Sequence, residues 1–293
     1  MKEVWHYRIY RAAFGTYLLH HFLGLLPWGT EIFSSAGVLP NSSSSPLMRL
    51  FPNLFLISDA PRFVASLLMV GAVCSLLFMV GKVERLAALV LWFLWASLYG
   101  RNPLIANPSL PFVGWLLLSH AVIGFNDRSS GMGGIPKDLF SAAWILMALS
   151  YSYSGYTKLI SPSWLDGTAL SYVLSNPLAR ATVVRVWLLS CPPILLKFAT
   201  WSTLGLELIF APVALFRRIR PWIWLAMVGL HLGLVVLVNF ADLTLGMLIV
   251  HMFTFDPAWL TRGNRSIEDA TTPAVFSPAR NPLVPWESSS AVR

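Results

Sequence analysis

Long apolar runs are the feature of this sequence that most restricts its fold. Eight of them follow one another between residues 11 and 255, several of them short for a bilayer-spanning helix. Only 12% of the 293 residues are charged, whereas soluble globular proteins contain about 25%. A large soluble domain is therefore excluded, and we predict an all-α, polytopic integral membrane protein.

The apolar runs define the predicted helices and domains. About eight transmembrane helices are expected, over residues 11–28, 63–80, 86–99, 110–125, 139–156, 194–215, 222–239 and 243–255. A short interfacial helix is expected over residues 169–174, on the external side. Residues 1–260 then form the membrane domain, and the polar, proline-bearing residues 261–293 are expected to be a disordered cytoplasmic tail.

The distribution of positive charge predicts the orientation in the membrane. With eight spans, the segments that share a side with the N-terminus carry 14 of the 21 Lys and Arg residues. The positive-inside rule then places both termini in the cytoplasm and residues 29–62 and 157–193 on the external, periplasmic or lumenal side. Because the basic residues are scattered and form no stripe with interleaved aromatic residues, we expect no nucleic-acid partner and name membrane lipid as the partner.

The two cysteines give no sign of a metal centre or a disulfide framework. Cys74 and Cys191 stand alone in apolar or proline-rich surroundings, and no cluster of Cys and His has the spacing of metal ligands. No metal site is predicted.

The end of the fifth predicted helix carries the first candidate catalytic residue. Tyr151, Gly155 and Lys158 share one helix face, because residues at i, i+4 and i+7 coincide. Lys158 either extends to the lipid headgroups or is a desolvated lysine that gives up its proton readily and can act as a general base. In the second case the hydroxyls of Tyr153 and Tyr156 would orient a substrate or a water molecule.

The segment that follows Lys158 resembles an interfacial turn. Trp164 is typical of a headgroup-level anchor, while Asp166 and Gly167 form the turn, with Asp166 or Thr168 capping the short helix that follows. A helix that lies at the interface behind a lysine would cover a pocket open to lipid-soluble ligands.

Further candidates are polar residues among apolar ones. Glu207 lies deep in an apolar run and needs either a partner or a water-filled cavity. His231 is in the middle of the seventh predicted helix, where a histidine commonly joins helices by hydrogen bonds. The polar break at Arg101 and Asn102 is either a simple loop or a source of donors toward the same external cavity as Lys158.

Taken in order, these motifs resemble a known family. They are the early stretch from Tyr7 to Gly15, the Arg101-Asn102-Pro103 break, the stretch from Tyr153 to Leu159 followed by Trp164-Leu165-Asp166-Gly167, Glu207 with Pro212, and His231. This order is similar to that of the HTTM (horizontally transferred transmembrane) family, whose domain resembles the membrane domain of vitamin K-dependent γ-glutamyl carboxylase. The resemblance covers roughly residues 7–260, and its most specific part is the Gly-x-x-Lys-Leu stretch with the following Trp-x-x-Gly.

The resemblance implies a reaction. In the carboxylase, reduced vitamin K is deprotonated and oxygenated by O2 to a strong base, which removes the γ-proton of a glutamate so that the carbanion captures CO2. By motif match, Lys158 would activate the reduced vitamin K or related quinone. We place this cofactor beside Tyr153, Tyr156, Trp164 and Asn102, and the substrate is expected to be a peptide or a small carboxylate.

A second hypothesis needs no catalysis. The chain would be a lipid- or quinone-binding membrane protein or an accessory subunit, in which Lys158 extends to the headgroups while Glu207 and His231 hold helices together. Replacement of Lys158 would then change little, whereas replacement of Glu207 would disturb folding.

Overall fold

Helices make up the whole secondary structure of the part of the chain described here. The computed structural model describes residues 2–41, 45–50, 52–123 and 135–260, and no strand occurs among them, which confirms the predicted all-α class. Contacts separate residues Met1–Phe255 from residues Asp256–Arg293, and the helices below belong to the first unit. The tail expected over 261–293 lies outside the described residues.

Each of the eight predicted helices corresponds to a helix of the structure. Their bounds are α1 (Lys2–Leu25), α3 (Pro61–Val80), α4 (Glu84–Arg101), α5 (Leu110–Ile123), α6 (Lys137–Lys158), α10 (Pro193–Ala214), α11 (Arg220–Leu237) and α12 (Ala241–Thr254). The short helices are α2 (Gly29–Phe33), α7 (Pro162–Leu165), α8 (Ala169–Ser175) and α9 (Val183–Ser190). The predicted interfacial helix over 169–174 corresponds to α8, whereas α9 was not expected from the sequence.

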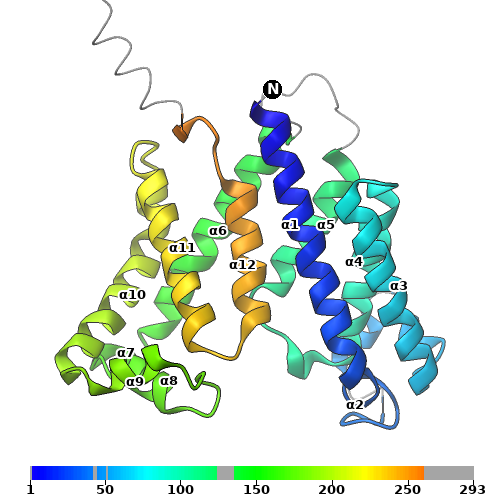
Figure 1. Ribbon diagram of the computed structural model, residues 1–293, viewed down its shortest axis with the longest axis horizontal. Coiled ribbons are helices and arrows are strands. Elements are labelled where there is room, and N and C mark those ends of the chain that lie inside the picture. The colour runs from blue at the N-terminus through cyan, green and yellow to red at the C-terminus, as the bar shows by residue number, and fades with distance from the viewer. Residues whose placement is uncertain (1, 42–44, 51, 124–134, 261–293) are drawn as a thin grey trace, which may run out of the picture. The chain divides into compact units, whose positions relative to one another are not determined.

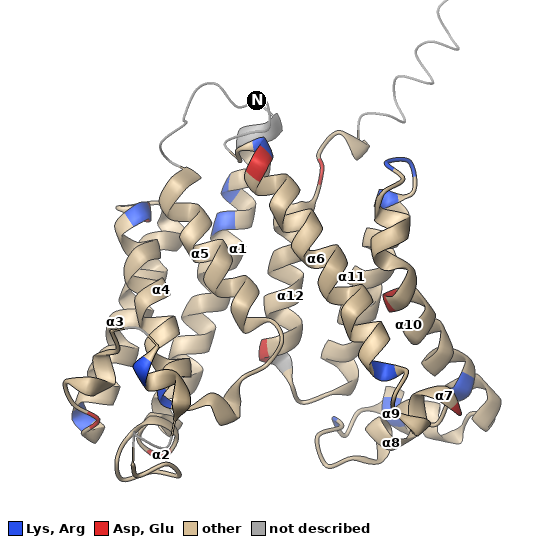
Figure 2. Cartoon of the chain, turned by 180° about the vertical axis from the view of Figure 1, so that it is seen from behind, with Lys and Arg blue, Asp and Glu red and all other residues tan. Residues whose placement is uncertain are grey.

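Three of these helices are long and apolar enough to cross a membrane. They are α3, α10 and α11, while α5 and α12 are apolar but shorter. Figure 2 shows that charged residues are few along the middle of the helices. The structure therefore supports membrane-spanning helices, and the count of eight spans stays a prediction.

Helix α3 shows how the sequence sets a boundary. It begins with Pro61, whose fixed φ suits the first helical position and whose missing N–H group would have had no partner there. It ends at Gly81, which takes the left-handed conformation (φ +77°) and returns its N–H to the carbonyls of Leu77 and Phe78. Proline before and glycine after the apolar run thus define the helix.

Helix α12 lies between two groups of helices (Figure 1). In one group α1 packs on α3, α3 on α4, and α4 on α5; in the other, α10 packs on both α6 and α11. Helix α12 contacts α1, α5, α6 and α11. Helix α1 begins, and α12 ends, at one end of the bundle, while α2 and α7–α9 lie at the other end (Figure 1). Residues from both groups therefore meet around α12.

Candidate functional site

The candidate site is a cavity of about 560 Å³, lined by residues of α6, α7, α8, α10, α11 and α12. This volume lies within the range of small-molecule sites, roughly 300–1,000 Å³. Seven of the 20 lining residues are large and aliphatic, namely Leu170, Val173, Leu230, Leu234, Leu237, Leu243 and Met247, while Ser150, Thr200 and Thr203 add hydroxyl groups. We call it the Lys158 cavity, and its walls suit an apolar ligand.

Lys158 and Glu207 form an ion pair in the wall of this cavity. Lys158 Nζ lies 2.5 Å from Glu207 Oε2 and also donates to Ser154 Oγ at 2.7 Å. The ammonium sits 5.0 Å from the centre of the Trp164 ring, within the range of a cation–π contact. The side chains are 21% and 9% exposed, respectively. Glu207 thus has the partner that its apolar surroundings required, and this partner is Lys158.

A close approach of α6 and α10 brings the pair together. Gly155 faces α10 so closely that a Cβ atom placed on it would lie 2.7 Å from the backbone nitrogen of Leu208. Any larger residue at this position must push the helices apart. Because Gly155 is one turn before Lys158 on the same face, and Leu208 follows Glu207, this contact sets the distance between the two charges.

A hydroxyl from α6 compensates for a proline inside α10. Pro212 has no N–H group to offer to the carbonyl of Leu208, and its ring crowds that carbonyl. Ser152 Oγ lies 3.0 Å from the Leu208 carbonyl and 3.2 Å from the Glu207 carbonyl, and it accepts the N–H of Ala211 at 2.9 Å. Polar side chains of neighbouring helices commonly satisfy a proline break in this way. The backbone of Glu207 is therefore held by α6 as well as by its own helix.

A tyrosine joins two buried histidines beside the ion pair. The hydroxyl of Tyr151 lies 2.6 Å from His231 Nε2 and 2.8 Å from His251 Nε2. One hydroxyl proton serves only one of these nitrogens, so the other histidine must carry its proton on Nε2 and donate it to Tyr151. The Nδ1 atoms of both histidines are buried and have no partner among the described residues. Of the two histidines, only His231 is among the residues that line the cavity.

Two glycines of α11 keep the cavity open. Gly229 and Gly233 both line it, one helical turn apart, and a Cβ atom at either position would meet no atom within 4 Å. The space that larger side chains would fill at these positions is therefore part of the cavity.

The structure separates the two tyrosines proposed to orient the ligand from the cavity. Tyr153 and Tyr156 are 69% and 65% exposed and do not line it. Trp164, by contrast, lines the cavity and covers the lysine.

Arg101 and Asn102 also lie away from the Lys158 cavity, at the end of α4. Arg101 is fully buried and donates through Nη2 to the carbonyls of Ser34 (3.2 Å) and Leu39 (2.6 Å), with Asp59 at 3.6 Å. Asn102 donates to the carbonyl of Ile32 at 2.8 Å. These side chains hold α2 and the segment that follows it against the end of α4.

Asp166 and Gly167 shape the turn between α7 and α8. The hydroxyl and the N–H of Thr168 both donate to Asp166 Oδ1, at 2.5 and 2.8 Å, and these bonds lower the pKa of that carboxyl below its usual value. Gly167 has a φ of +82°, and a Cβ atom placed on it would meet the side chains of Lys197 and Trp201 of α10. The turn therefore places α8 against α10 and over the cavity.

Among the described residues, no group of three or more His, Cys, Asp and Glu side chains could hold a metal ion. Sequence reasoning missed Ser152 and Ser154 as parts of the site, whereas a histidine such as His251 in an apolar helix is expected to join helices by hydrogen bonds. The signal for Ser154 was present, since it precedes Lys158 by four residues and so shares its helix face. Ser152 could be recognised only from its packing against Pro212.

Comparison with known proteins returned no relative: no protein-family model, no curated protein and no solved structure matches the chain.

Proposed function

We propose that this chain is a multi-pass membrane enzyme that binds a reduced quinone in the Lys158 cavity, takes a proton from its hydroxyl and couples its oxygenation to CO2 addition. One observation carries the proposal: a lysine–glutamate pair stands in the wall of a cavity of about 560 Å³ whose large lining side chains are mainly aliphatic. Charged groups in such surroundings are costly and commonly mark a functional site.

The lining fits a reduced quinone in size and polarity. Aliphatic side chains of α8, α11 and α12 suit the ring system and its apolar tail. Lys158 suits one hydroxyl, and the hydroxyl groups of Ser150, Thr200 and Thr203, which also line the cavity, suit another. Trp164 covers the lysine, and such shielding from water strengthens the electrostatic interactions of the pair.

The pair can take up a proton without leaving an uncompensated charge. Lys158 passes one of its protons to Glu207 at 2.5 Å and takes one from the bound hydroxyl, so that its ammonium stays beside the developing negative charge. Ser154 holds the nitrogen in place during this exchange. The reduced quinone, when bound, supplies the electrons that convert O2 into a base strong enough to remove a proton from the carbon of a peptide or small carboxylate.

The arrangement of the helices supports a multi-pass topology. Helix α1 begins and α12 ends at the same end of the bundle (Figure 1), as an even number of crossings requires. The excess of Lys and Arg in the segments on that side then favours cytoplasmic termini, with the turn over the Lys158 cavity on the external side.

The proposal is tested with the full chain purified in detergent. The assay supplies vitamin K hydroquinone or menaquinol, O2, labelled bicarbonate and a glutamate-containing peptide, and it measures label in the peptide. We expect Lys158→Ala to lower incorporation by about 10²-fold or more. Lys197→Ala, which removes a lysine of α10 that does not line the cavity, should keep wild-type activity. Incorporation by Lys158→Ala at the wild-type rate would refute the role of this residue.

The ion pair also favours a second candidate function. Because Lys158 is already bonded to Glu207 and Ser154, the pair could serve only to join α6 and α10 in a quinone- or lipid-binding protein without catalysis. Quinone that copurifies with the wild-type chain, combined with no incorporation of label, would identify this function.

A further inference from the structure

A second cavity of about 310 Å³ lies on the other side of the start of α12. Asn107 and Asp242 line this second cavity, while the next residue in each case, Pro108 and Leu243, lines the Lys158 cavity. The proposed function makes no use of this second cavity, which we call the His21 cavity.

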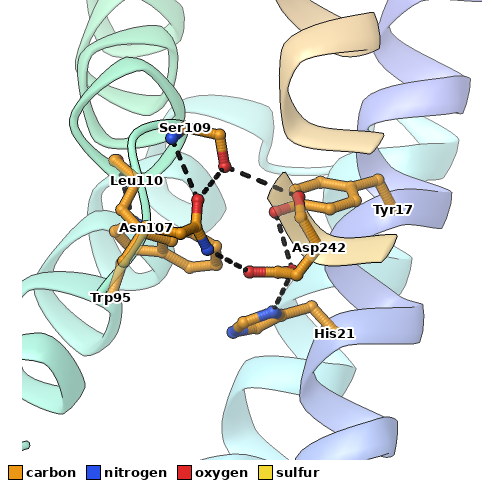
Figure 3. Close-up of polar contacts among 7 residues, drawn as sticks. All are labelled: Tyr17, His21, Trp95, Asn107, Ser109, Leu110 and Asp242. Carbon is orange, nitrogen blue, oxygen red and sulfur yellow. Dashed lines mark hydrogen bonds and ion pairs between the residues drawn. The ribbon is translucent and has the colours of Figure 1, made fainter. Parts of the chain in front are cut away.

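Three donors hold the carboxylate of Asp242 at the edge of the His21 cavity (Figure 3). Tyr17 donates its hydroxyl to Oδ1 at 3.0 Å, His21 Nδ1 lies 2.7 Å from the same oxygen, and Asn107 Nδ2 donates to Oδ2 at 3.1 Å. The amide of Asn107 is itself oriented by Ser109, whose N–H and hydroxyl both donate to its oxygen. Asp242 also lies in the first turn of α12, where the helix dipole favours negative charge. Partners from the protein thus occupy three of the roughly four acceptor positions of the carboxylate.

This arrangement fixes which nitrogen of His21 carries the proton. A carboxylate accepts hydrogen bonds, so Nδ1 must be the protonated nitrogen and Nε2 of the neutral ring presents a lone pair. Nε2 is buried and has no partner among the described residues, and Figure 3 shows it pointing away from Asp242. His21 is only 9% exposed, and its ring packs on Trp95 with 4.5 Å between ring centroids. The orientation of the ring is therefore set from two sides.

The lining defines what kind of molecule the free nitrogen would accept. Side chains such as Leu25, Ile32, Ile105 and Leu245 make most of the wall apolar, and no Lys or Arg is among the described lining residues. Because Asp242 already has three donors, it offers little to a cationic ligand, and an anion would face its charge. The remaining requirement is a single hydrogen-bond donor on an apolar body.

We propose that the His21 cavity is a second binding site, which takes a neutral apolar molecule through one hydroxyl group that donates to His21 Nε2. Asp242 acts as a positioning residue: in the neutral ring its bond to Nδ1 fixes the tautomer, so that Nε2 is the acceptor. This site is independent of the reaction proposed for the Lys158 cavity.

The test uses two probes that share a naphthalene ring and its oxygen, one with the O–H donor and one with that hydrogen replaced by a methyl group. Labelled 1-naphthol carries the hydroxyl, 1-methoxynaphthalene lacks it, and both are titrated against the purified full chain in detergent. We expect His21→Phe to weaken 1-naphthol about tenfold, the effect of one lost hydrogen bond to a buried acceptor, and to leave 1-methoxynaphthalene unchanged. The same affinity for both probes in the wild-type protein would overturn the proposal.

Glycine variants identify the cavity that binds the probe. Gly24 lines the His21 cavity and Gly233 lines the Lys158 cavity, whereas Gly205 lines neither. A Cβ atom added at any of these three glycines would meet no atom within 4 Å. Gly24→Leu should abolish the hydroxyl-dependent binding, whereas Gly205→Leu should not. Loss of that binding in Gly233→Leu instead would place the probe in the Lys158 cavity and overturn the inference.

A measurement on the wild-type protein avoids any effect of substitution on folding. In protein with ¹⁵N-labelled histidine, the resonance of the unprotonated Nε2 of His21 should move toward the value of a protonated nitrogen when 1-naphthol is added. No change in this resonance at saturating probe would overturn the proposal.

Discussion

Replacing both members of the Lys158–Glu207 pair should harm the protein less than replacing either one. In Glu207→Leu the ammonium keeps only Ser154 and the face of Trp164, and in Lys158→Met a carboxylate that is 9% exposed loses its cation. Breaking a fully buried pair costs about 3–5 kcal/mol, so the partial exposure of Lys158 reduces our expectation to about 2 kcal/mol for each single variant.

The free energy of unfolding of the double variant decides whether the two side chains interact. Because apolar residues of similar size often replace a buried pair without loss, we expect the double variant to lose at most about 1 kcal/mol relative to the wild type, which gives a coupling free energy of about 3–4 kcal/mol. The assay is unfolding by SDS in mixed micelles, followed by tryptophan fluorescence, with Lys197→Met as a control for loss of one positive charge. If the effects of the single variants simply add in the double variant, the two side chains do not interact in the folded protein.

Three further predictions concern the cavity and its cover. Gly233→Leu should reduce the amount of menaquinol that copurifies with the chain by tenfold or more while Gly205→Leu does not, as measured by mass spectrometry; equal amounts would show that the ligand binds elsewhere. Tyr151→Phe leaves two buried histidine nitrogens without their partner and should lower the free energy of unfolding by about 1–3 kcal/mol, in the same SDS assay. Thr168→Val removes a donor and should raise the pKa of Asp166 toward its ordinary value, which a ¹³C NMR titration measures. Since the pKa of Asp166 is lowered in the folded state, its stabilising contribution is present at neutral pH and is lost as the pH falls through that pKa, so wild type and variant should differ at pH 7 and converge in acid.

The helices could be predicted from the sequence because residues at or next to their ends determine where they begin and end. An apolar run that starts at Pro61 and stops at Gly81 becomes α3 with those limits, and the short helix α8 follows the turn at Asp166 and Gly167. Helix α9 was missed because its eight residues are too few to stand out within an apolar chain. Whether a helix crosses the bilayer depends on the helices that pack against it as well as on its own length. The sequence of the helix alone does not show which helices these are.

The candidate site was only partly accessible to the same reasoning. Lys158 and Glu207 could each be selected, since a charge in an apolar run needs an explanation. That they are partners could not, because 49 positions separate them and their meeting depends on the contact of Gly155 with α10. Tyr153 and Tyr156 were chosen for their nearness to Lys158 along the chain. A helix turns by about 100° per residue, so neither shares the face of the lysine.

The two glycines of α11 that line the Lys158 cavity have a consequence for how the ligand range of this protein could change in evolution. Two glycines in a helix cost roughly 1–2 kcal/mol relative to alanine, so the open volume beside Gly229 and Gly233 is maintained against helix stability. The charges stand on α6 and α10, whereas the room for a ligand is governed from α11. Small steps from glycine to alanine or serine on α11 would therefore change the size of molecule admitted without touching the proton-carrying groups. Ligand range and chemistry can evolve separately in such a design.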